Sequence, residues 1–211
     1  MDEKRRHFWR YLTESYGAFL TFKDPSQQDR ADRYPDAETI WLVGTLNCST
    51  CVGFYIKLDD THYFIAHINA SNARLWTQHG NTQPWLTRTG TAEDEQRMYN
   101  TVLTMLRTKF AEKGWTLTGQ ERVVICCPWP EHGGQVYSGT HVIRVIKDFL
   151  GNGGRNLTEE NLSGFIVDQR TGEVLEKFAR NKTFGADVGA PELPRYVRRW
   201  ETVIEPWWIN V

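Results

Sequence analysis

The sequence predicts a mixed α/β (α+β) fold, a single layered domain in which a largely antiparallel sheet is covered by two or three helices. Paired segments with alternating apolar and polar residues surround short turns, and segments with helical periodicity separate these pairs. The chain has 211 residues, 40% hydrophobic and 24% charged, with a formal net charge of −1. This length fits one domain, and the apolar content excludes a disordered protein. The charge argues against a general nucleic-acid binder.

The chain divides into three expected parts: an N-terminal helix and loop over 1–36, a catalytic core over 37–180 and a Trp/Arg-rich extension over 181–211. A helix is expected over 5–20 because large apolar residues recur there at spacings of three and four. A strand is expected over 39–46. Two further strands, over 51–58 and 62–70, flank an acidic turn and predict a hairpin.

The second half of the core alternates helices with strands. Apolar residues on one face predict a helix over 92–113, which ends at Gly114. A Val-Val-Ile run predicts a buried strand over 122–127. A second helix is expected over 138–150, followed by a hairpin whose strands, 164–168 and 173–178, flank an Arg-Thr-Gly turn.

The first hairpin places a thiol and an imidazole on one face. Side chains alternate between the faces of a strand, so the apolar even-numbered residues of both strands share the core face and the odd-numbered residues share the other. Cys51 and His67 are both odd. A three-residue loop over 59–61 pairs His67 with Gly53, which has no side chain to intervene. Cys51 then lies diagonally across the strand pair from His67, with about 7–8 Å between the two backbones.

A thiol beside an imidazole is the minimal activated nucleophile, because the imidazole takes the proton and the thiolate attacks a carbonyl. Two plainer interpretations stay open. A buried cysteine often serves as a small apolar residue, and a histidine on a strand is often a structural residue with satisfied hydrogen bonds.

These residues resemble the Thr/Cys/His arrangement of CheD-type receptor glutamine deamidases and of protein N-terminal asparagine amidohydrolases. Thr45 precedes Cys51 by six positions, and Ser49-Thr50-Cys51 is similar to the nucleophile segment of the second group. The resemblance spans about residues 39–178, although the CheD-like glycines before the nucleophile and after the fourth strand are missing. It implies a CheD-like fold and a thioester intermediate on Cys51, with His67 moving the proton and Thr45 holding the imidazole or the substrate.

The partner that resolves the thioester decides the activity. Water would make the chain a deamidase acting on Gln or Asn of a protein; an amine would make it an amide-bond-forming enzyme. The small, Trp-rich chain also resembles the fungal arginine-containing cyclodipeptide synthases, which implies aminoacyl-tRNA as the substrate. We place this synthase ahead of the deamidase, because the CheD-like glycines are missing and both termini interleave cations with aromatic residues.

Those termini supply the expected tRNA contacts, Arg5, Arg6, Arg195, Arg198 and Arg199, since cations bind phosphates and aromatic rings stack on bases. Solvated faces of amphipathic elements are the alternative explanation. The residues expected to contact substrate are Asn69, Gly53, Trp129 and Glu201. The carboxylates that could pair with an arginyl group are Asp59, Asp60, Glu131, Asp187 and Glu201.

The four cysteines allow a second type of site. Cys48-x-x-Cys51 with Cys126-Cys127 could bind zinc, but adjacent residues of a strand point to opposite faces, so Cys126 and Cys127 cannot easily share one ion. We therefore expect neither metal nor cofactor. A non-catalytic binding module also stays open. The charged N-terminus predicts a cytoplasmic protein, and no apolar run is long enough for a membrane span.

Overall fold

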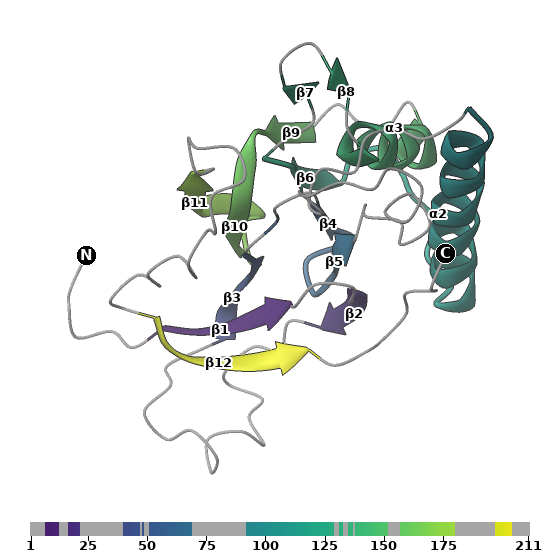
Figure 1. Ribbon diagram of the computed structural model, residues 1–211. Coiled ribbons are helices and arrows are strands. Elements are labelled where there is room, and N and C mark those ends of the chain that lie inside the picture. Colours follow the sequence, from purple (N-terminus) through teal and green to yellow (C-terminus); the bar gives the residue numbers. More distant parts are fainter. Residues whose placement is uncertain are drawn as a thin grey trace.

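A computed structural model describes residues 7–12, 17–21, 40–46, 48, 51–68, 92–128, 131–132, 135–136, 138–151, 157–179 and 197–203. Its described elements form three layers, with two helices on one sheet and a second sheet on that sheet's other face (Figure 1). The predicted α+β class is confirmed. Among the described residues, no helix is both long and apolar enough to cross a membrane.

The central layer is a five-stranded sheet in the order β2-β5-β4-β6-β9. The pairs β2–β5, β5–β4 and β4–β6 are antiparallel, and β9 runs parallel to β6. The bounds are β2 Gly17–Thr21, β4 Val52–Lys57, β5 His62–Ile68, β6 Arg122–Cys126 and β9 Leu157–Glu160.

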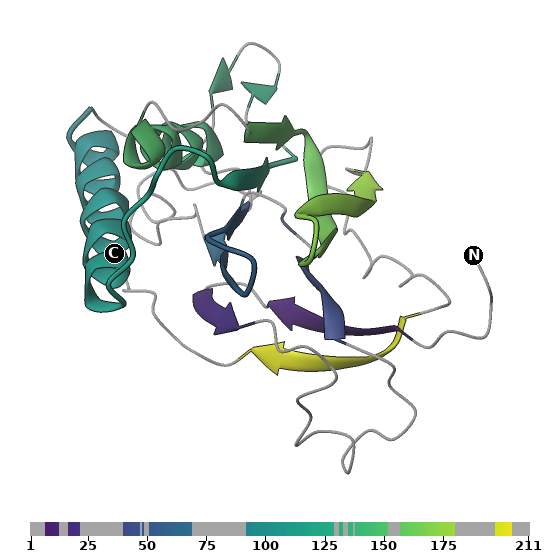
Figure 2. The same cartoon turned by 180° about the vertical axis from the view of Figure 1, so that it is seen from behind.

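The outer sheet has the order β11-β10-β3-β1-β12. The pairs of β10 with β11 and with β3 are antiparallel, whereas β1 runs parallel to both β3 and β12. The bounds are β1 His7–Leu12, β3 Ile40–Thr45, β10 Leu162–Asp168, β11 Glu173–Ala179 and β12 Val197–Val203. Figure 2 shows β1 and β12 side by side at the lower edge of the molecule.

The helices α2 (Ala92–Glu112) and α3 (Ser138–Leu150) cover the central sheet on one side. Their apolar faces pack on the even-numbered side chains of β4 and β5, such as Phe54 and Phe64. Both helices and the strands from β3 to β6 confirm the sequence-based predictions within a few residues. A two-stranded ribbon of β7 (Glu131–His132) and β8 (Gln135–Val136) completes the described elements.

The predicted helix over 5–20 is wrong. Residues 7–12 and 17–21 are strands, each in a different sheet. The aromatic residues that suggested a helical stripe are also typical of strands. Pairing with distant segments settles the conformation, because β1 lies between β3 and β12 and β2 pairs with β5. The first and last parts of the chain therefore join the same sheet as β3.

Candidate functional site

The β4–β5 hairpin carries the candidate site on the face that meets the outer sheet. Gly53 pairs with His67, as the three-residue loop predicts, and the turn closes with the Leu58 N–H donating to the His62 carbonyl at 2.9 Å. Cys51 immediately precedes β4 and packs in the core between the two sheets. The predicted separation of the faces is confirmed, because the even-numbered apolar residues pack under the helices instead.

The outer sheet supplies the third side chain. Thr45 is the last residue of β3, and its Oγ1 lies 2.7 Å from Nδ1 of His67 in a buried hydrogen bond. β10 holds this end of β3 through the pairing of Phe165 with Thr45. Gly164 permits the close approach, since a Cβ there would lie 2.3 Å from the Thr45 carbonyl oxygen. These contacts hold Thr45 in the outer sheet, where it faces His67 of the central sheet.

Burial keeps the imidazole of His67 neutral. The side chain is 1% exposed, and loss of hydration lowers its pKa from 6.5 to about 4. When Nδ1 carries the proton and donates it to Thr45 Oγ1, Nε2 is the basic nitrogen. Within the part of the chain that the structure describes, this buried Nε2 has no hydrogen-bond partner. A neutral imidazole with a free ring nitrogen is the form that a general base requires.

Gly53 makes room for the side chains around the site. A Cβ at this position would lie 2.7 Å from Cys126 Sγ, 2.8 Å from Thr45 Cγ2 and 3.1 Å from Phe165 Cε1. The space that a side chain of β4 would occupy is therefore filled from three sides by β6, β3 and β10. Gly53 was one of the expected substrate contacts. In the structure, side chains of the protein itself fill the space next to its Cα.

The cysteines divide between the two cores. Cys48, Cys51 and Cys126 pack in the core between the sheets, whereas Cys127 packs under the helices. Cys48 Sγ lies 4.0 Å from Cys126 Sγ, and burial, together with this contact, raises the pKa of the Cys48 thiol. Cys48 is thus held as a neutral thiol, the unreactive form.

The expectation that Cys126 and Cys127 face opposite sides of their strand is confirmed. The four thiols therefore do not converge on one point. Among the described residues, no group of three or more His, Cys, Asp or Glu side chains is arranged to hold a metal ion.

Two of the candidate carboxylates have a structural role in the hairpin turn. Asp59 Oδ1 accepts hydrogen bonds from the backbone N–H groups of Thr61 and His62, both at 2.6 Å, and these bonds lower the pKa of its carboxyl group despite some desolvation. Asp60 is exposed beside it. This turn adjoins His62, and His67 lies five residues further along β5, about 17 Å away. Neither carboxylate therefore reaches the thiol and imidazole.

Several predicted residues lie outside the described part of the chain: Arg5, Arg6, Asn69, Trp129, Asp187 and Arg195. For Arg198, Arg199, Glu201 and Glu131 the description covers only their place in a strand. Cys126 Sγ lies beside Gly53. Phe165, which pairs with Thr45, was missed by sequence reasoning, and the only signal for it was the apolar character of its strand.

Comparisons with known proteins give no identification: no protein-family model matches the chain, and neither does any curated protein.

Proposed function

We propose that the protein is a cysteine-dependent acyl-transfer enzyme in which Cys51 is the nucleophile and His67 is the general base. Thr45 is the positioning residue. The observation that carries the proposal is the 2.7 Å hydrogen bond between His67 Nδ1 and Thr45 Oγ1. With Nδ1 as the donor, Nε2 is the basic nitrogen, on the hairpin face shared with Cys51. In this proposal the Thr45 hydroxyl orients the His67 imidazole, as the third group does in a set of nucleophile, base and orienting residue.

The proposed reaction has two balanced steps. The Cys51 thiol gives its proton to Nε2 of His67, while the sulfur forms a bond to the carbonyl carbon of the substrate. Collapse of the tetrahedral intermediate breaks the bond to the leaving group, which takes the proton from His67, and a thioester remains on Cys51. An amine or water then attacks the thioester and restores the thiol. The backbone N–H of Cys51 is the candidate donor to the oxyanion.

The low pKa of His67 determines how the thiolate forms. A free thiol ordinarily has a pKa of about 8.5, so transfer of its proton to an imidazole with a pKa of about 4 is unfavourable before the substrate arrives. We infer that proton transfer accompanies attack on the carbonyl, with no stable thiolate–imidazolium pair in the resting enzyme. Since Cys51 and His67 are buried, the covering segments must move to admit a substrate.

For the acyl group we favour an aminoacyl residue taken from tRNA, with cyclodipeptide formation as the overall reaction. The supporting observation is the parallel pairing of β1 with β12, in which Trp9 lies opposite Trp200 and Phe8 opposite Arg199. The described parts of the two stretches that interleave cations with aromatic residues, 7–11 and 197–200, therefore lie on neighbouring strands. One continuous strip can contact the phosphates and bases of an acceptor end more firmly than two separate elements.

Protein Gln or Asn deamidation is the second candidate. It is favoured by the order of elements after the nucleophile: the β4–β5 hairpin, α2, β6, α3 and the β10–β11 hairpin follow in the sequence expected from the CheD resemblance. In that reaction ammonia leaves from the tetrahedral intermediate and water resolves the thioester.

Product analysis tests the proposal and separates its two forms. The purified protein is incubated with arginyl-tRNA plus a second aminoacyl-tRNA and, separately, with Gln and Asn peptides. A cyclic dipeptide supports the synthase, and release of ammonia supports the deamidase. Both products should disappear in Cys51→Ala and persist in Cys127→Ala, because Cys127 packs in the other core. Product formation by Cys51→Ala would refute the acyl-enzyme.

A further inference from the structure

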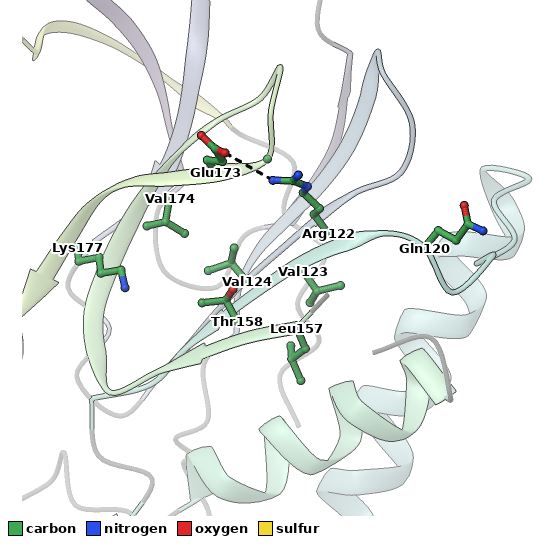
Figure 3. Close-up of a pocket in the computed structure, with 10 residues that line it drawn as sticks. Gln120, Arg122, Val123, Val124, Leu157, Thr158, Glu173, Val174 and Lys177 are labelled. Atoms are coloured by element: carbon green, nitrogen blue, oxygen red, sulfur yellow. Dashed lines mark ion pairs between the residues drawn. The ribbon is translucent and has the colours of Figure 1, made fainter. Parts of the chain in front are cut away.

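A cleft of about 640 Å³ lies away from the thiol and imidazole, between β6 and β9 of the central sheet and β11 of the outer sheet (Figure 3). The chain passes from β9 to β10 at Asn161 and so changes sheets at this corner. The volume of the cleft lies within the range of small-molecule sites, about 300–1,000 Å³.

A β-bulge in β11 directs two different side chains into the cleft. Ile166 pairs with Glu176 and Val167 pairs with Val174, so Leu175 is an extra residue opposite them. An extra residue reverses the alternation of faces beyond it. Val174 and Lys177, an even and an odd position, consequently both line the cleft, while Leu175 is 51% exposed.

Cations reach the cleft from two strands of different sheets. Arg122 comes from β6 and Lys177 from β11, and their side chains are 52% and 49% exposed. Arg122 Nη1 lies 4.0 Å from Glu173 Oε1, and Lys177 forms an ion pair with Glu160. An exposed ion pair at 4.0 Å contributes little free energy, so the carboxylate of a ligand can displace Glu173 from the guanidinium.

Apolar side chains line the cleft between these charges. Val124 of β6 and Val174 of β11 line it on the side where the two sheets face each other, whereas Leu157 of β9 pairs with Val123 and packs toward the helices (Figure 3). Val124 also packs in the inter-sheet core that contains Cys51 and Cys126. The cleft contains none of the residues of the candidate active site.

We propose that this cleft binds an amphipathic carboxylate, an organic acid with a short apolar chain. Arg122 holds the carboxylate by charge-assisted hydrogen bonds, and the apolar chain packs on Val124 and Val174. A neutral or cationic compound of the same shape lacks the first interaction, and acetate lacks the second. The site is independent of the acyl-transfer chemistry.

Calorimetric titration of the full chain with octanoate tests this site, with octylamine and acetate as comparison probes. We expect saturable binding of octanoate alone. Arg122→Gln should weaken it about tenfold through loss of the charge-assisted bonds, and Glu173→Gln should strengthen it by removing the competing carboxylate. The matched control Arg107→Gln, at an exposed position of α2, should leave the affinity unchanged.

A second readout locates the ligand. Octanoate should shift the methyl resonances of Val124 and Val174, and it should do so equally in Cys51→Ala, so this result does not depend on the proposed catalysis. Failure of octanoate to saturate, equal binding of octylamine, or unchanged affinity in Arg122→Gln would each overturn the proposal. Loss of binding in Arg107→Gln would also overturn it, because it would assign the contact to a different surface.

Discussion

Burial of the neutral His67 imidazole should make the protein sensitive to mild acid. The unfolded chain binds this proton with a pKa of 6.5 and the folded chain with a pKa of about 4. Between these values the unfolded state holds more protons, so the free energy of unfolding falls as the pH falls. At about 1.4 kcal/mol per pH unit, the loss from His67 alone reaches about 2 kcal/mol at pH 5 and about 3 kcal/mol at pH 4.

Urea unfolding from pH 7 to pH 4 measures this loss. Carboxylates also titrate in this range, so the informative quantity is the difference between wild type and His67→Gln. Wild type should lose about 3 kcal/mol more than His67→Gln. Parallel pH dependence in the two proteins would refute the reasoning. An NMR titration of the His67 ring in wild type gives the pKa directly, and a midpoint near 6.5 would refute it too.

Three further substitutions test the packing around the site. Tyr55→Phe should stabilise the fold by about 1 kcal/mol in urea unfolding, because the buried Oη has no hydrogen-bond partner among the described residues; destabilisation would show that it has one. Gly53→Ala should destabilise by about 1–3 kcal/mol through its contacts with Cys126 and Thr45, and Cys126→Ala should partly restore stability in the double variant; full stability of Gly53→Ala would contradict this packing. Thr45→Val should lower the acyl-transfer rate about tenfold by releasing Nδ1 of His67, while Thr45→Ser retains most of the rate; equal rates in both variants would remove Thr45 from the mechanism.

The hairpin was predictable because its information is local. Alternation of polarity along 51–58 and 62–70 assigns the faces, and the short loop fixes the register that pairs Gly53 with His67. The bond from Thr45 to His67 needed more than local information. The two residues belong to different sheets, and only the packing of these sheets brings the hydroxyl to Nδ1.

The prediction of the fold was wrong or incomplete for strands that pair with distant parts of the chain. β1 pairs with β12 about 190 residues away, and its aromatic residues suit a helix or a strand equally in isolation. β9, with the sequence Leu-Thr-Glu-Glu, lacks alternating apolar residues because it lies at the edge of its sheet. Its conformation depends on parallel pairing with β6.

The cysteine spacing predicted only part of the arrangement of the thiols, because one of their contacts joins distant parts of the chain. The opposite orientation of Cys126 and Cys127 follows from strand geometry and is observed. The 4.0 Å approach of Cys48 to Cys126 joins positions 78 residues apart, and no spacing in the sequence indicates it. Burial and that contact hold Cys48 as a neutral thiol.

The most direct test of the central claim is intact mass spectrometry of the protein after brief incubation with aminoacyl-tRNAs or with Gln and Asn peptides, quenched in acid to preserve thioesters. The account predicts a single acyl adduct that maps to Cys51, is released by hydroxylamine, forms in Cys48→Ala and is absent from Cys51→Ala. An adduct that persists in Cys51→Ala, or substrate turnover by wild type without any acyl adduct on Cys51, would contradict it.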